Sequence, residues 1–376
     1  MFMRLMALLS FQAETSMKRI VLACDGTWNT PDQRDKEERE RLWAYVLRQV
    51  RALRAGEKLD GFRPGKRKPT NVVKLIRAVL PCDAAGVVQI SFYDKGVGTH
   101  WGISKWVEGA TGYGVSRNII ETYQFLCLNY QAGDEIFIFG FSRGAFTARS
   151  LVALLTKVGV LPKAHIFYSP EAYKLYRTQA DAAEFRKEHE CLDVTIRFLG
   201  VFDTVGALGI PVGVLNIFTR RLYRFHDVSL SPIVEHAFHA LALDERRKQF
   251  APTLWDPDQR VPVERMEQVW YAGVHSNIGG GYDPDGLANI PLHSMKNRAQ
   301  SLKLAFDEAF LANYKPNPAG EMRQSRKGIY RLTRKLCRPV LKTPHGNERI
   351  HETVGEREDR AVPSYKPQNP GYRRPS

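Results

Sequence analysis

One short motif limits most strongly what this chain can fold into. Residues 140–144 read Gly-Phe-Ser-Arg-Gly and stand directly between the apolar run EIFIF and the helix-like run AFTARSLVALL. A serine on a sharp strand-to-helix turn has strained backbone angles, and small neighbours such as Gly140 and Gly144 let strand and helix approach closely. The motif therefore predicts an α/β fold with Ser142 as a nucleophile. The alternative is an ordinary strand-to-helix turn with a capping serine.

Two backbone positions are expected to bind an oxyanion beside this serine. The amide of Arg143 stands at the positive end of the following helix, where a negative charge is stabilised. A second donor is expected from Gly26 or Thr27, in the loop that follows the first apolar run. Asp25 and Asn29 in the same loop are interpreted as supporting residues that orient it through local hydrogen bonds.

Apolar runs alternate along the chain with stretches of helical periodicity. Strands are expected at 18–24, 87–93, 135–139, 195–202 and 268–272, and helices at 71–80, 113–130 and 145–158. This alternation predicts a mostly parallel central sheet with helices on both faces. Three stretches interrupt it and are interpreted as insertions, with helical cap segments among them: about 31–69, 162–193 and 208–262.

The base and the acid of a nucleophilic relay are expected at the ends of later strands. Asp203 ends the run RFLGVFD and His275 ends the run VWYAGVH, which gives the chain order serine, acid, histidine of the α/β-hydrolase fold. Three other histidines compete for the role of base, but they are assigned to a helical insertion and to lid or pocket roles: His226, His236 and His239.

Another reading of the acidic residues is a metal site. Asp25, Asp94 and Asp283 are its candidate ligands, but the loop-orienting role of Asp25 is the favoured reading. We expect no metal and no cofactor, because a serine relay needs neither.

Composition bounds the partners and the compartment. The 376 residues carry a formal net charge of +15, so an anionic partner is expected: lipid headgroups, nucleic acid or an acidic protein. Five cysteines without C-x-x-C spacing indicate reduced thiols and a cytoplasmic protein. No apolar stretch reaches 18 residues, which predicts no transmembrane helix, and the short apolar run near the start is weak as a signal peptide.

The two ends of the chain are set apart from a catalytic domain expected at 18–312. Residues 1–17 are interpreted as a disordered extension or a mis-assigned start. Residues 313–376 hold fifteen Lys and Arg against six Asp and Glu, and form either a solvated basic tail or a segment packed on the domain. The few tyrosines of this segment are too widely spread for a base-stacking surface, so nucleic acid is not a favoured partner.

An uncharged segment at 204–219 suggests the substrate class. It follows Asp203 and is followed in turn by the basic, aromatic cluster 220–224. Such a segment suits either a lid that enters an anionic lipid interface or a buried cap that lines an acyl pocket. Both readings favour an apolar acyl substrate.

Six ordered blocks resemble one known family. They are ACDGTWN, YDKGVGT, GDEIFIFGFSRGAFTARSL, GVFDTVGALG, HALALDERR and VWYAGVHSNIGGGY. Together they resemble the uncharacterised α/β-hydrolase domain of the type VI secretion phospholipase effectors (Tle-type lipases). The resemblance runs from about residue 18 to about residue 372 when the runs IHETVGER and YKPQNPGY near the end are counted with them. The resemblance implies serine esterase chemistry on membrane phospholipids, with the nucleophile at Ser142, the acid at Asp203 and the histidine at His275. Asn277 departs from the aspartate that is usual in the family.

The resemblance also implies export by a type VI secretion system, with a secretion-apparatus partner or a cognate inhibitor. The leading hypothesis is therefore a lipase or phospholipase A that forms an acyl-enzyme. Two alternatives stay open: a non-catalytic binding or scaffold protein with this fold, and a soluble short-chain carboxylesterase.

Overall fold

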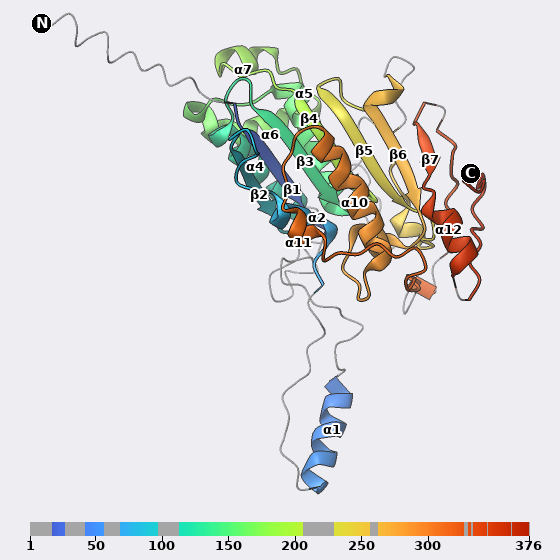
Figure 1. Cartoon of the computed structure of the whole chain (residues 1–376). Coiled ribbons are helices and arrows are strands. Elements are labelled where there is room, and N and C mark those ends of the chain that lie inside the picture. Colours follow the sequence, from blue (N-terminus) through green and yellow to red (C-terminus); the bar gives the residue numbers. More distant parts are fainter. Residues whose placement is uncertain are drawn as a thin grey trace, which may run out of the picture.

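The seven strands of the described residues lie in a single parallel sheet. The computed structural model describes residues 17–26, 42–55, 68–96, 113–205, 229–255, 262–326, 330–331, 334–343, 345–361 and 363–375. The strands are β1 (Arg19–Cys24), β2 (Gln89–Asp94), β3 (Glu135–Phe141), β4 (Ile196–Phe202), β5 (Val234–Ala242), β6 (Met266–Tyr271) and β7 (Glu348–Ile350). Their order is β2-β1-β3-β4-β5-β6-β7, and every neighbouring pair is parallel (Figure 1). The carboxyl ends of all strands therefore meet at one edge of the sheet.

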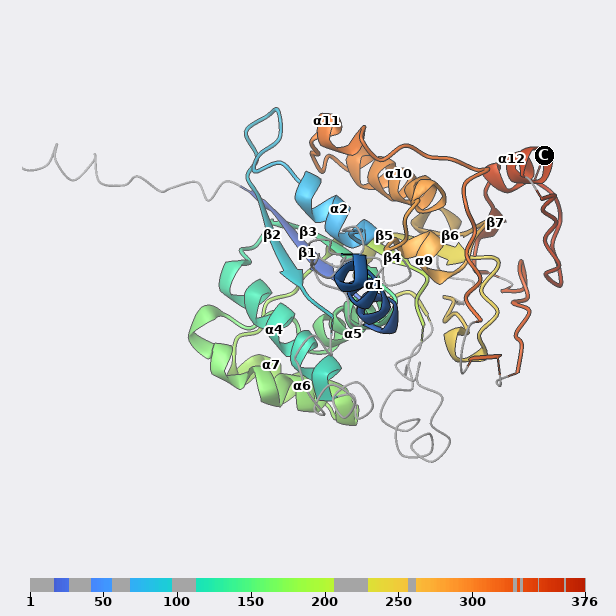
Figure 2. The same cartoon turned by 90° about the horizontal axis from the view of Figure 1, so that it is seen from below.

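Helices cover both faces of this sheet. The helices of the described residues are α1 (Leu42–Ala55), which stands away from the sheet in Figure 1, α2 (Asn71–Ala78), α4 (Tyr113–Asn129), α5 (Arg143–Val158), α6 (Ser169–Thr178), α7 (Ala183–Glu188), α9 (His275–Gly279), α10 (Gly286–Ser301), α11 (Glu308–Leu311) and α12 (Thr353–Arg360). Short 3-10 turns are η3 (Lys163–Tyr168), η4 (Lys248–Phe250) and η5 (Val263–Arg265). In Figure 2, α4, α5, α6 and α7 lie on one face, and α2, α10 and α11 lie on the other. The predicted α/β-hydrolase fold class is confirmed.

Two hydrophobic cores, one on each face, hold these layers together. Along β3 the side chains of Ile136 and Ile138 enter the core shared with α4 and α5. Phe137 and Phe139 alternate with them and enter the core shared with α2 and α10. Because each fully buried side chain of this size contributes about 2–3 kcal/mol, the central strands anchor the edge where the site lies.

One predicted element is wrong. The stretch 208–262 was expected to be a cap insertion with a helical part, but it contains β5, which lies between β4 and β6 in the sheet. Its sequence VEHAFHALA is rich in alanine, a poor strand former, and two histidines interrupt its apolar pattern, so its strand signal is weak. His236 and His239 therefore lie on a sheet strand and not in a helical insertion. His226 lies outside the described residues.

The end of the chain packs on the sheet. Strand β7 pairs with β6, and a third apolar cluster joins Leu243 and Trp270 to Val340 and Val354. The reading of residues 313–376 as a solvated tail is therefore wrong for the part of this segment that the structure describes.

Other expectations fall partly or wholly on undescribed residues. Residues 206–228 lie outside the described residues. They include most of the segment 204–219 and all of the basic cluster 220–224. Residues 1–16 also lie outside the described residues. Helix α1 lies in the expected insertion 31–69, and η3, α6 and α7 lie in 162–193. All five cysteines are free. No helix in the described ranges is both long and apolar enough to cross a membrane.

Candidate active site

Ser142 occupies the sharp turn between β3 and α5. Its backbone angles are φ 59° and ψ −120°, a region that residues other than glycine rarely adopt. The Ser142 amide donates to the Phe202 carbonyl at 3.0 Å, which ties the turn to the end of β4. A Cβ atom at Gly144 would lie 2.2 Å from the Cys24 carbonyl oxygen, and one at Gly140 would lie 2.6 Å from the Ala145 Cα. Both glycines are therefore needed for this turn.

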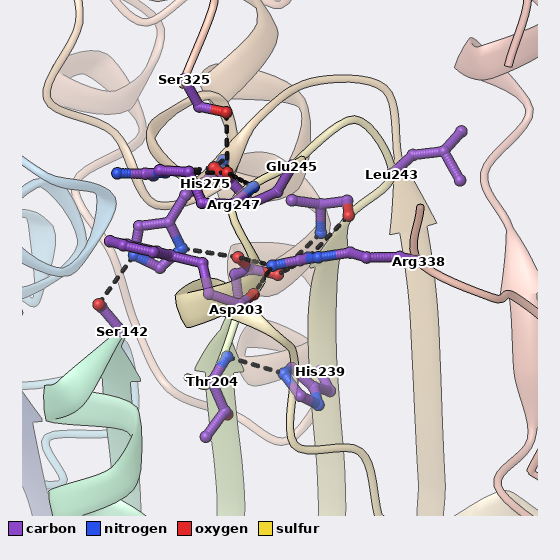
Figure 3. Close-up of polar contacts among 12 residues, drawn as sticks. Ser142, Asp203, Thr204, His239, Leu243, Glu245, Arg247, His275, Ser325 and Arg338 are labelled. Atoms are coloured by element: carbon purple, nitrogen blue, oxygen red, sulfur yellow. Dashed lines mark hydrogen bonds and ion pairs between the residues drawn. The ribbon is translucent and has the colours of Figure 1, made fainter. Parts of the chain in front are cut away.

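His275 and Asp203 stand next to this serine in a continuous chain of hydrogen bonds (Figure 3). His275 Nε2 lies 2.8 Å from Ser142 Oγ, and His275 Nδ1 lies 2.6 Å from Asp203 Oδ2. Asp203 follows β4 directly and His275 is the first residue of α9, so both sit at the carboxyl edge of the sheet. When Nδ1 donates to the carboxylate, Nε2 is left to accept the serine proton.

Asp203 is completely buried and has a cation of its own. Arg338 Nη1 donates to Oδ1 at 2.6 Å and Nη2 donates to Oδ2 at 3.1 Å, while the Ala242 amide donates to Oδ1 at 3.0 Å. Burial by itself raises the pKa of this carboxyl, but the charge of Arg338 and the hydrogen bond from His275 outweigh burial and hold the pKa well below its usual range. Asp203 is thus ionised at neutral pH.

His275 lies between aromatic rings. Its ring centroid is 4.7 Å from that of Phe141 and 4.9 Å from that of Phe250. Burial lowers the pKa of His275, against the opposing effect of Asp203. The imidazole is therefore neutral at pH 7, which is the form that can take a proton from Ser142.

A second buried ion pair lies on the other side of His275. Glu245 Oε2 accepts from the His275 amide at 3.3 Å, and the two Glu245 oxygens accept from Arg247 Nε at 2.9 Å and Nη2 at 2.8 Å. Ser325 Oγ also donates to Glu245 at 2.8 Å. Burial opposes ionisation of Glu245, but Arg247 outweighs it and lowers the pKa to about 2. This pair fixes the start of α9, and with it the histidine.

The expected oxyanion donors have different surroundings. The amide of Arg143 is the first of α5, where helix amides have no acceptor within the helix. The Gly26 amide donates to Asp25 Oδ1 at 2.7 Å, so it is already engaged. Asp25 Oδ2 also accepts from the hydroxyls of Thr70 at 2.6 Å and Tyr93 at 2.9 Å, as suits a residue that orients a loop. Thr27 and Asn29 lie outside the described residues.

Asn277 caps the helix that carries His275. Its Oδ1 accepts from the Val274 amide at 3.2 Å, and its Nδ2 donates to the Glu321 carbonyl at 3.4 Å. An aspartate at this position can accept the first bond but cannot donate the second. The amide therefore links α9 to the stretch that follows α11.

The candidate metal ligands lie in different surroundings. Asp283 forms an ion pair with Lys68 at 2.6 Å, and burial raises the pKa of Asp94 to about 7. Within the described ranges, no group of three or more His, Cys, Asp or Glu side chains is arranged to hold a metal ion. The competing histidine His239 accepts from the Thr204 amide at 3.1 Å and does not form part of the serine relay.

Comparison with known proteins identifies the family. Residues 18–298 match the family described as T6SS, phospholipase effector Tle1-like, catalytic domain. The chain belongs to this family. The Tle1-like match includes Ser142, Asp203 and His275, and ends at residue 298, so that it leaves out about the last fifth of the chain.

Individual relatives are more distant. The uncharacterized protein YEL023C of Saccharomyces cerevisiae is 30% identical over 233 residues, which are 54% of this chain and 33% of that protein. The match to a crystal structure of an uncharacterized protein from Pseudomonas aeruginosa covers 82% of this chain and 50% of that protein's chain, with 16% identity and a TM-score of 0.45. The match to the structure of a Tle1 effector bound to the VgrG spike of a type 6 secretion system covers 71% of this chain and 52% of that chain, with 21% identity and a TM-score of 0.36. The chain thus spans a third to a half of these relatives.

Sequence reasoning missed three residues beside the relay. Glu245 and Arg247 lie in HALALDERR, and the apolar run that ends there in acidic residues was a usable sign of a strand end. Arg338 lies 135 residues from its partner Asp203 and beyond the Tle1-like match, and no local pattern distinguishes it from other arginines of the basic segment.

Proposed function

We propose that this protein is a serine hydrolase that cleaves the acyl esters of phospholipids, as a lipase or phospholipase A. The observation that carries the proposal is the hydrogen-bonded chain from Ser142 through His275 to Asp203, on a strained turn at the carboxyl edge of the sheet. A turn that merely capped a helix would need neither the strained serine nor a buried histidine 2.8 Å from its hydroxyl.

The mechanism follows from the hydrogen bonds of His275 to Ser142 and to Asp203. Ser142 Oγ attacks the ester carbonyl carbon while its proton passes to His275 Nε2, and Asp203 stabilises the imidazolium through Nδ1. The amide of Arg143 stabilises the oxyanion of the tetrahedral intermediate. The intermediate collapses to an acyl-serine as His275 gives its proton to the departing alkoxide. Water, deprotonated by His275, then releases the carboxylic acid and restores the serine.

Phospholipid is the proposed substrate class because of the family and the charge. Members of the Tle1-like family are described as phospholipase effectors. The net charge of +15 favours binding to an anionic lipid surface.

The decisive experiment compares the wild type with Ser142→Ala and with Ser301→Ala, which removes an exposed hydroxyl at the end of α10. Fatty acid release from vesicles of mixed phosphatidylcholine and phosphatidylglycerol is measured beside hydrolysis of a short p-nitrophenyl ester. We expect both activities in the wild type and in Ser301→Ala, and neither in Ser142→Ala. Activity on the short ester alone would indicate a carboxylesterase and not a lipase. If the wild type neither hydrolyses a substrate nor reacts with a fluorophosphonate, the hydrolase proposal fails.

Membership of a secretion-effector family also supports a secretion-apparatus partner, and we extend the proposal to one. Co-purification of the full chain with spike proteins of its own organism tests this point. Binding that survives washing in 150 mM salt supports it, whereas no enrichment over an unrelated basic protein removes it.

A further inference from the structure

Arg338 is built into the site from outside the family's catalytic domain. It is 0% exposed and comes from the stretch between α11 and β7, beyond residues 18–298. Besides its two bonds to Asp203, it donates to the carbonyls of Ala242, at 2.7 Å, and Phe250. Its own backbone is held by Asn369, whose Nδ2 donates to the Arg338 carbonyl at 2.9 Å and to the Leu243 carbonyl at 2.8 Å.

We propose that Arg338 is a positioning residue of this active site, which fixes the rotation of the Asp203 carboxylate toward His275 and balances its charge. This inference rests on the proposed hydrolase function. It assigns a direct active-site role to a residue of the segment after residue 298, beyond the Tle1-like match.

The geometry accounts for the orienting role. A carboxylate rotates about its Cβ–Cγ bond, and a single hydrogen bond from His275 leaves part of that rotation open. The planar guanidinium contacts both oxygens of Asp203, and a fork of this kind fixes the plane of the carboxylate. The two carbonyl bonds fix the guanidinium in turn. Lysine carries the same charge but cannot reproduce this planar contact.

The charges around His275 account for the second role. The charged and titratable groups near it are the pairs Asp203–Arg338 and Glu245–Arg247, with Arg143 on α5, His239 on β5 and Tyr330 beyond Phe250. Burial lowers the pKa of His239 to about 3, so it is neutral. The imidazole thus faces two balanced ion pairs. Without Arg338 the negative charge of Asp203 is no longer balanced, and the Asp203–His275 pair binds a proton more tightly.

The experiment measures how the reactivity of Ser142 depends on pH. Labelling by a fluorophosphonate and hydrolysis of a p-nitrophenyl ester are followed from pH 4.5 to 9 in the wild type, Arg338→Met, Arg338→Gln and Arg338→Lys. Arg349→Met is the matched control, because it removes a cation of the same segment that pairs with Glu267 and not with Asp203. Circular dichroism melting establishes that each variant is folded.

In Arg338→Met and Arg338→Gln, the two neutral variants, we expect the acid limb of the pH–activity profile to move to higher pH by about 1 pH unit. Arg338→Lys should keep the wild-type acid limb but lower kcat by about 10- to 100-fold, because the carboxylate loses its fixed plane. Arg349→Met should match the wild type. A folded neutral variant with an unmoved acid limb would overturn the charge-balancing role, even if its rate had fallen.

The remaining outcomes also decide the matter. If neither neutral variant folds, Arg338→Lys decides alone, and a wild-type kcat in that variant overturns the positioning role. If the wild type is not labelled at any pH, the proposed hydrolase function fails and this inference fails with it. If the wild type is labelled and the Arg338 variants have the same rates and pH profile as the wild type, the hydrolase proposal stands and only the positioning role of Arg338 is overturned.

Discussion

Gly144→Ala is the substitution for which the structure predicts the largest effect from the smallest change. The added Cβ would lie 2.2 Å from the Cys24 carbonyl oxygen and 2.5 Å from the Asp25 carbonyl oxygen. Both are backbone atoms at the end of β1, so no side chain can rotate out of the way. To restore normal contact, the start of α5 must move away from β1 by about 1 Å.

This displacement affects stability and activity together. Overpacking of this kind costs about 1–3 kcal/mol, which would lower Tm by roughly 1–4 °C in a chain of this size. Ser142 and the Arg143 amide move with the helix, and a misplacement of about 1 Å can lower kcat/KM by about 100-fold. The activity loss should therefore far exceed what the stability loss explains at 25 °C.

The assay compares kcat/KM on a p-nitrophenyl ester, and Tm, between the wild type, Gly144→Ala and Gly355→Ala. The last is the control, because a Cβ at Gly355 in α12 meets nothing closer than 3.6 Å. The control should keep its activity and melt at the wild-type temperature or slightly above, since alanine favours a helix. Wild-type activity in folded Gly144→Ala would refute the view that this close approach positions the nucleophile.

Three further predictions concern the groups around His275. The acid limb of kcat/KM should have its midpoint below about 6.5, because burial lowers the pKa of His275 and keeps the base neutral as pH falls; a midpoint above 7 in a pH–rate profile would contradict this. Asp203→Asn should lower kcat by about 10³- to 10⁴-fold, because the amide no longer holds the required tautomer; a loss under tenfold in steady-state ester hydrolysis would argue against the relay. Glu245→Gln should lower the free energy of unfolding by about 3 kcal/mol, because the Arg247 cation keeps no buried counter-charge; an unchanged urea midpoint would show that this pair contributes little.

Much of the fold could be predicted because it depends on local backbone requirements. The turn at Ser142 needs small residues at Gly140 and Gly144, a buried strand before it and a helix after it, and all of these lie within a few neighbouring residues. The strand ends at Asp203 and His275 were identified in the same way, from apolar runs that stop at a polar side chain. Strand β5 was not predicted because alanines and histidines weaken its apolar pattern. Only its place between β4 and β6 in the sheet makes this segment a strand.

The sequence by itself determined which residues stand at the carboxyl edge of a parallel sheet, since that follows from the order of strands and turns. Only the tertiary structure decided what surrounds them. Thr70 and Tyr93 donate to Asp25, Glu245 anchors the start of α9, and Arg338 reaches Asp203 from 135 residues away. Contacts between distant segments leave no periodic trace in either segment. A buried arginine in a basic stretch resembles its exposed neighbours until the chain has folded around it.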